Sequence, residues 1–180
     1  EAAPNGRAYF FEWSPDGQRI VFGVQPRPAR IQILPNYSGR FVSARQFQRT
    51  VAGDDAAGPV LYTVSSRGGK PVRLGEASGP EWSPDSRSIL AHHVSADRKK
   101  DSFLIFDAAT GKPRTLFQNT DPKWVAQAFW MWSPDGREVA LTSDRDGFLH
   151  LYRIPAAGGQ PVQITKGPWE LDTERFGFNP

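Results

Sequence analysis

A five-residue motif that occurs three times constrains the fold of this 180-residue chain more than any other feature of the sequence. Trp-Ser-Pro-Asp-Gly covers residues 13–17 and 132–136, and Trp-Ser-Pro-Asp-Ser covers residues 82–86, so the copies lie 69 and 50 residues apart. Proline sets φ for the second position of a tight turn, aspartate bonds its own backbone two residues further on, and glycine accepts a positive φ. Each copy therefore predicts a tight turn that directly follows a tryptophan.

The same series of short segments follows each copy of the motif. A short apolar strand led by a basic residue comes first, at residues 19–22, 87–91 and 137–141. An aromatic strand comes next, at residues 60–64, 103–106 and 149–154. A glycine turn and a closing strand complete each unit, at residues 68–74, 111–116 and 158–165. Together with the strand that ends at the tryptophan, each unit has four strands.

Units of four antiparallel strands cannot cover their own faces, so neighbouring units must stack. The sequence thus predicts an all-β fold, a β-propeller with about three four-stranded antiparallel blades of a larger ring. Trp13, Trp82 and Trp132 are expected at equivalent, largely buried positions, because each supplies a large apolar surface to the packing between blades.

The predicted chain organisation is a single partial propeller over residues 1–180. Its approximate blades are residues 8–75 with a long insertion at 25–55, residues 79–117 and residues 127–166, and a further blade starts at 174–180. The insertion is equally compatible with a working face, with a covered blade edge, or with a crossing to a neighbouring domain. The chain ends in Phe178-Asn179-Pro180, 46 residues after Trp132, where the next Trp-Ser-Pro is expected, so we expect an incomplete ring.

Composition excludes several functional classes. The chain has no Cys, which excludes disulfides, Cys-ligated zinc and a thiol nucleophile. No run of 18 apolar residues exists, so no transmembrane helix is expected. The net charge of +3 comes from basic residues interspersed with acids, and the basic cluster at 98–100 precedes Asp101 in a predicted solvated loop. Nucleic acid is therefore not an expected partner.

A search for catalytic and metal-binding patterns finds no constellation that points to chemistry in this chain. No Ser has glycines two residues before and two residues after it, and residues 75–79 come nearest with the wrong spacing. His92 and His93 are adjacent in a strand and point to opposite faces, and His150 is expected to be packed or hydrogen-bonded in its strand. No cofactor is predicted.

Two acidic segments are better interpreted as turns than as sites. Residues 144–147, Asp-Arg-Asp-Gly, begin like a calcium loop, but Pro155 stands where the bidentate Glu is needed, so a hairpin turn is predicted. Asp54 and Asp55 are interpreted as a surface turn. The sequence therefore assigns no catalytic, cofactor-binding or metal-binding residue, and it leaves the substrate-binding residues unknown.

The repeats resemble those of TolB-type propellers, and the wider order of segments resembles the propeller domain of dipeptidyl peptidase IV-like serine peptidases, in the prolyl oligopeptidase superfamily. Residues 35–37, 49–53 and 60–64 follow the family's order of Pro-x-Tyr, Arg-x-x-Ala-Gly and a strand. Residues 143–152 look like its Ser-Glu-Arg-Asp-Gly-aromatic-x-His-Leu-Tyr, and residues 164–171 look like its Leu-Thr-x-Gly-x-Trp-Glu-Val.

This resemblance implies a propeller segment of a dipeptidyl-peptidase-like serine exopeptidase, which gates and helps to bind peptide substrates. It also implies an α/β-hydrolase domain elsewhere in the full-length protein and a periplasmic or secreted location. The family's adjacent Glu pair is absent here and its catalytic triad lies outside the propeller, so this chain alone is expected not to be catalytic. The alternative is a TolB-like non-enzymatic propeller that binds protein partners, and a Gly-x-Ser-x-Gly elbow in the full reading frame would discriminate the two.

Overall fold

The computed structural model describes residues 6–26, 58–120 and 129–172, and these residues form twelve strands in three four-stranded antiparallel sheets. The first sheet contains β1 (Gly6–Trp13), β2 (Arg19–Pro26), β3 (Val60–Ser65) and β4 (Val72–Glu76). The second contains β5 (Ser78–Trp82), β6 (Ser88–Val94), β7 (Lys100–Asp107) and β8 (Pro113–Thr120). The third contains β9 (Trp130–Trp132), β10 (Glu138–Ser143), β11 (His150–Pro155) and β12 (Val162–Gln163).

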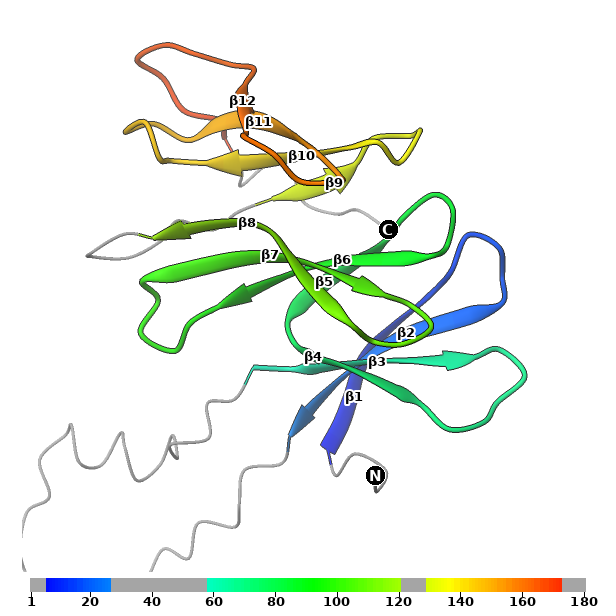
Figure 1. Ribbon diagram of the computed structural model, residues 1–180. Coiled ribbons are helices and arrows are strands. Elements are labelled where there is room, and N and C mark those ends of the chain that lie inside the picture. The colour runs from blue at the N-terminus through cyan, green and yellow to red at the C-terminus, as the bar shows by residue number, and fades with distance from the viewer. Residues whose placement is uncertain (1–5, 27–57, 121–128, 173–180) are drawn as a thin grey trace, which may run out of the picture.

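Figure 1 shows the three sheets stacked in chain order, each with its strands in sequence order from one edge to the other. The predicted all-β architecture of antiparallel four-stranded blades is confirmed. Most of the predicted insertion, the pair Asp54 and Asp55, and the segment 174–180 lie outside the described residues. Within the described part of the chain, no helix has the length and hydrophobicity that a membrane crossing requires.

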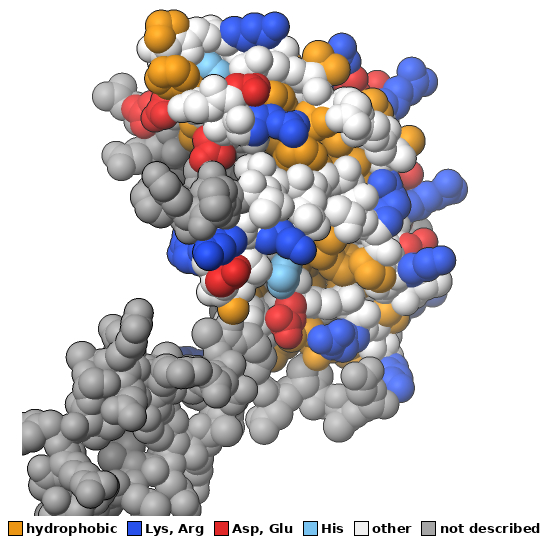
Figure 2. All heavy atoms as spheres, turned by 60° about the vertical axis from the view of Figure 1, so that its left-hand side comes forward, with side chains coloured by type: hydrophobic (Ala, Val, Ile, Leu, Met, Phe, Trp, Pro, Cys, Tyr) orange, Lys and Arg blue, Asp and Glu red, His pale blue; other side chains and the backbone are white. Residues whose placement is uncertain are grey.

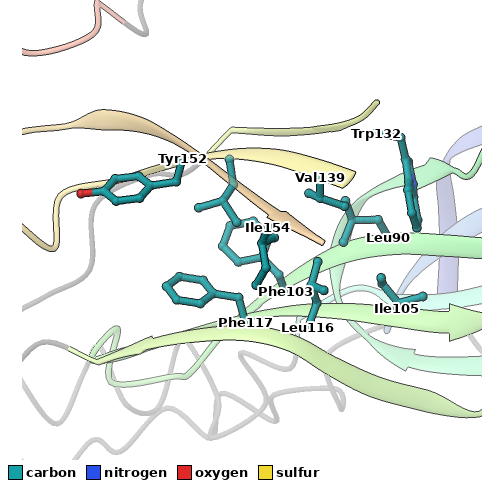
Figure 3. Close-up of a cluster of buried hydrophobic side chains, with 10 residues drawn as sticks. Leu90, Phe103, Ile105, Leu116, Phe117, Trp132, Val139, Tyr152 and Ile154 are labelled. Carbon is teal, nitrogen blue, oxygen red and sulfur yellow. The ribbon is translucent and has the colours of Figure 1, made fainter. Parts of the chain in front are cut away.

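Two apolar cores hold the stack together, one in each space between sheets. Side chains alternate between the two faces of a strand, so the middle sheet contributes one set of residues to each core. The core between the first two sheets contains Val21, Leu61, Leu74, Ala77, Trp82, Ile89, Ala91, Phe106 and Ala108. In the other core, Figure 3 shows side chains of the third sheet directed toward those of the second; its members are Leu90, Phe103, Ile105, Leu116, Phe117, Trp132, Val139, Leu141, Tyr152 and Ile154.

The tryptophans of the repeat occupy equivalent places, as predicted. Trp13, Trp82 and Trp132 each end the first strand of a sheet, and each lies opposite a β-branched residue of the second strand. Trp82 and Trp132 are only 5% and 9% exposed. Each of these two packs on the sheet that precedes its own in the chain.

Trp13 departs from the prediction of burial, since 53% of its surface is exposed. The reason is that no sheet precedes β1 among the described residues, so the face that Trp13 occupies is uncovered. Phe11, two residues earlier, is 75% exposed, and Phe22 lies opposite Phe11 on the neighbouring strand. Tyr62 stacks on Phe22 with 5.5 Å between ring centroids, so this open face is aromatic.

Candidate functional site

The turns after the tryptophans share one hydrogen-bond arrangement. In the first copy, Ser14 Oγ donates to Asp16 Oδ1 (2.6 Å), and the backbone N–H of Gln18 donates to the same oxygen (2.9 Å). The backbone N–H of Arg19 donates to Ser14 Oγ (2.9 Å). The second and third copies repeat all three bonds. The aspartate thus bonds the backbone two residues further on, as its position in the motif predicted.

These bonds fix the charge state of the three turn aspartates. The serine hydroxyl and then the backbone N–H hold the pKa of Asp16, Asp85 and Asp135 below the usual value for a carboxyl group, because both donors stabilise the charged form. Each turn therefore presents an ionised carboxylate at neutral pH, with one oxygen occupied by the turn itself.

A fourth turn of the same kind joins β6 and β7 at the opposite end of the second sheet. Ser95 Oγ donates to Asp97 Oδ1 (2.6 Å), and the backbone N–H of Lys99 donates to that oxygen (3.2 Å). Arg98 has φ +57° in the place that Gly17 takes in the first motif. The segment predicted to be a solvated basic loop is exposed, and it forms a turn of the same kind without the tryptophan, proline and glycine of the first motif.

The three tryptophan-linked turns lie at one end of the stack, on the right of Figure 1. The backbone N–H of Asp16 donates to Ser86 Oγ (3.0 Å), which joins the first turn to the second. Ser86 has φ +62°, a left-handed conformation that the glycines of the other copies adopt more easily. In the third copy Gly136 lies against Pro84, and it has no side-chain hydroxyl that could make the corresponding hydrogen bond between turns.

A cavity of about 450 Å³ opens between the second and third of these turns. Its walls come from the β5–β6 turn and the start of β6, from β8, from the end of β9 and the β9–β10 turn, and from the turn after β11. The lining residues are Ser83, Pro84, Asp85, Ser88, Arg114, Trp132, Asp135, Gly136, Ala156 and Ala157. Trp132 is one of the lining residues, and its indole N–H donates to the backbone oxygen of Glu81 (3.2 Å). Arg114 donates from its guanidinium to the backbone oxygen of Ala156.

Two glutamates stand next to the tryptophans at the first strands. Glu12 and Glu81 each precede the tryptophan that ends the strand, and Met131 takes this place in the third sheet. Glu81 Oε1 accepts a hydrogen bond from the backbone N–H of Trp132 (3.1 Å). Burial raises the pKa of both carboxyl groups; at Glu81 the bond from Trp132 opposes the rise and the charge of Glu12 adds to it. The sequence search missed this pair, although a Glu before the tryptophan in two of three repeats was a visible signal.

The histidines serve the packing of the sheets. His92 is buried between Phe103 and Trp130, at centroid distances of 4.8 and 5.0 Å, with Nε2 3.5 Å from Asp101 Oδ2. Its neighbour His93 is half-buried.

His150 is buried and hydrogen-bonded, as its strand context predicted. Its Nε2 lies 3.1 Å from the backbone oxygen of Gly167 and its Nδ1 lies 3.2 Å from Thr165 Oγ1. Trp169 meets the ring edge-on at 5.0 Å. The predicted hairpin turn at 144–147 is present, since Gly147 N–H donates to the backbone oxygen of Asp144 (2.8 Å). Among the described residues, no three His, Cys, Asp or Glu side chains gather as metal ligands would.

Charged side chains are dispersed over the surface. Figure 2 shows Lys and Arg side chains spread over one face, with Asp and Glu side chains between them. Duplex and single-stranded nucleic acids are bound by continuous basic stripes or patches. The interspersed charges of this face do not form such a patch.

Comparison with known proteins places this architecture in a family. The sequence model of the family described as the dipeptidyl peptidase IV (DPP IV) N-terminal region matches residues 59–179, more than half of the chain. Dipeptidyl-peptidase 5 of Porphyromonas gingivalis is 25% identical over 160 residues, which are 87% of this chain and 21% of that protein. The chain therefore spans about a fifth of this curated relative's length.

Solved structures agree on the fold. The crystal structure of Porphyromonas gingivalis dipeptidyl peptidase 4 superposes with a TM-score of 0.62 at 14% identity, over 90% of this chain and 25% of that chain. The structure of a putative TolB from Agrobacterium tumefaciens gives 0.57 at 18% identity, over 93% of this chain and 50% of that chain. The propeller fold and the resemblance stated from the repeats are thus confirmed, and the chain belongs to the family of dipeptidyl peptidase IV N-terminal regions.

Proposed function

We propose that this chain is the propeller segment of a dipeptidyl-peptidase-type serine exopeptidase, in which it limits access to the active site and helps to hold peptide substrates. The nucleophile, base and oxyanion hole are supplied by an α/β-hydrolase domain of the full-length protein. The observation that carries the proposal is the family match over residues 59–179.

The position of the first strands supports a role in access. The strands at one edge of every blade surround the central channel of a propeller. We assign that edge to β1, β5 and β9, because they are equivalent edge strands of the three sheets and β5 contacts β9 of the next sheet. Glu12 and Glu81 lie on two of these strands, and carboxylates at a channel edge attract the ammonium group of a peptide rather than a polyanion.

The open aromatic face of the first sheet supports a ring that continues beyond the described sheets. The same face of the second and third sheets is covered by the sheet before it, and there Trp82 and Trp132 are buried. Exposed contiguous aromatic faces mark interaction surfaces. We therefore propose that another blade of the full-length protein packs on Phe11 and Trp13.

A non-enzymatic propeller that binds protein partners is the second candidate. The TolB match favours it, because that superposition covers 93% of this chain and half of the TolB chain. The reading frame of the full-length protein separates the candidates: a peptidase requires a nucleophile elbow, Gly-x-Ser-x-Gly, outside this propeller.

The experiment compares the full-length protein with the 180-residue chain on a Gly-Pro chromogenic amide. The proposal predicts turnover by the full-length protein that a serine-directed inhibitor abolishes, and no turnover by the chain alone. For the access role, rates should fall steeply as the substrate grows from a dipeptidyl amide to a folded protein, and the hydrolase domain expressed without the propeller should lose this size dependence. Equal size dependence in both preparations would refute the gating role while leaving the peptidase assignment intact.

A further inference from the structure

Three hydrogen bonds join the third sheet to the edge strand of the second sheet. The indole N–H of Trp132 donates to the backbone oxygen of Glu81 (3.2 Å), and the backbone N–H of Trp132 donates to Glu81 Oε1 (3.1 Å). The indole N–H of Trp130 donates to the backbone oxygen of Gly79 (3.2 Å), where a Cβ atom would lie only 2.5 Å from the Trp130 ring. The edge formed by β5 and β9 is therefore fastened at two successive points along β5.

The corresponding edge between the first and second sheets, formed by β1 and β5, is not fastened in this way. Trp82 takes the place of Trp132, but its buried indole nitrogen has no hydrogen-bond partner among the described residues. Pro80, two residues before Trp82, takes the place of the other tryptophan, and proline has no N–H to donate. Burial raises the pKa of Glu12 without an opposing hydrogen bond, whereas at Glu81 the bond from Trp132 opposes the rise.

The first and second sheets are fastened instead at their turn end. The backbone N–H of Asp16 donates to Ser86 Oγ (3.0 Å), which joins the two tryptophan-linked turns. Arg19 Nη1 and Thr63 Oγ1 both donate to the backbone oxygen of Ala108, at 3.2 and 3.0 Å. The space between the second and third sheets also has one guanidinium bond at this end. The two spaces thus differ chiefly along β5, where only the second is fastened by tryptophans.

This difference changes the free energy of parting the sheets at each edge. A buried N–H without an acceptor costs folding free energy, because it has given up its hydrogen bonds to water. Parting β1 from β5 lets water reach the Trp82 indole, so part of the cost of opening is returned. It also relieves the repulsion between Glu12 and Glu81, which contributes to the raised pKa of Glu81. Parting β5 from β9 instead breaks three hydrogen bonds.

We propose that the first and second sheets part at the β1–β5 edge by rotation about the hydrogen bonds of their turn end, while the second and third sheets stay joined along β5. The edge opens and closes as a local fluctuation of the folded chain. In a ring whose channel is lined by β1, β5 and β9, this motion widens the channel beside Glu12 and Glu81 and admits an extended peptide. That consequence rests on the proposed peptidase function, whereas the opening itself does not.

The test is hydrogen exchange of the indole N–H groups in the ¹⁵N-labelled 180-residue chain, followed in ¹⁵N–¹H spectra after transfer to D₂O. Trp82 is 5% exposed and Trp132 is 9% exposed, so static burial alone predicts that Trp82 exchanges no faster. We expect the opposite, with the protection factor of the Trp82 indole about tenfold lower than that of the Trp132 indole. The backbone amides of Val21 and Leu61, in the centre of the first sheet, should stay as protected as the Trp132 indole.

Two sets of variants separate the causes. Trp82→Phe and Trp132→Phe remove equal ring area, but only the second breaks a hydrogen bond, so its urea midpoint should be the lower of the two. Glu12→Gln removes the repulsion with Glu81 and should raise the protection of the Trp82 indole about threefold, with that of the Trp132 indole unchanged.

The proposal is overturned if the Trp82 indole is protected as well as the Trp132 indole. It is also overturned if the amides of Val21 and Leu61 exchange as fast as the Trp82 indole, because the whole first sheet then unfolds instead of its edge opening. None of these measurements needs a substrate. Absence of peptidase activity in the full-length protein would therefore refute the proposed function and leave the opening of this edge untouched.

Discussion

Truncating two equivalent tryptophans should have very different costs in this chain. Trp132→Ala removes a side chain that is 9% exposed and that contacts the apolar core between the second and third sheets. Loss of a buried tryptophan costs about 3–5 kcal/mol in free energy of unfolding. The bond from its indole N–H to Glu81 is lost as well, which adds about 1 kcal/mol at most and is partly included in that range.

Trp13→Ala is the matched control. The same repeat position in the first sheet is 53% exposed, so truncation there should cost less than about 1 kcal/mol. Urea titration followed by far-ultraviolet circular dichroism measures both, since the unfolding midpoint can be read from the backbone signal in either variant. Equal losses in the two variants would refute the claim that the preceding sheet, rather than the turn, determines burial. In the full-length protein the control should become costly, because another blade is proposed to cover Trp13.

Three further outcomes follow from the turns and the third sheet. Ser86→Ala should be less stable than Ser86→Gly by about 1 kcal/mol. Both variants lose the hydrogen bond to Asp16, but only glycine adopts the positive φ of this position without a free-energy cost. Equal urea midpoints would contradict this. The pKa of Asp16, Asp85 and Asp135 is lower in the folded than in the unfolded chain, so the charged carboxylates stabilise the fold above the unfolded pKa of about 4, and this contribution is lost as the pH falls through the folded pKa values. Asp135→Asn should therefore flatten the dependence of the unfolding midpoint on pH between about 2 and 5. An unchanged slope would count against this reasoning. Burial and then the hydrogen bond to Asp146 raise the pKa of Tyr152 to about 12. The contribution of the protonated phenol to stability is therefore complete below about pH 10 and declines as the pH rises toward 12. Absorbance at 295 nm should show one tyrosine that ionises at a higher pH than the others, and Tyr152→Phe should remove it.

The repeat motif was sufficient to predict the fold because its physical causes are local. The side-chain bonds of Ser14 and Asp16 connect residues at most five apart, so they can be inferred from the order of residue types. The same is true of the hairpin turn at Asp144 and of the strand position of His150. The exposure of Trp13 could not be inferred in this way, since it depends on which sheet lies beside β1.

The cavity was likewise invisible in the sequence. Its lining comes from segments that are far apart in the sequence, at 83–88, 114, 132–136 and 156–157, and none of these residue types signals a site on its own. Glu81 was missed for a related reason, because its partner Trp132 N–H lies in the next sheet, 51 residues away in the sequence.

The fourth turn, between β6 and β7, has an evolutionary consequence. Residues 95–100 reproduce the bonds of the motif with alanine in place of proline and arginine in place of glycine, so the arrangement requires little more than Ser-x-Asp. A connection that satisfies its own polar groups leaves none unpaired when it is copied to another hairpin. Gene duplication or deletion can therefore add or remove whole blades without repairing each loop. Selection then acts chiefly on the surfaces between them.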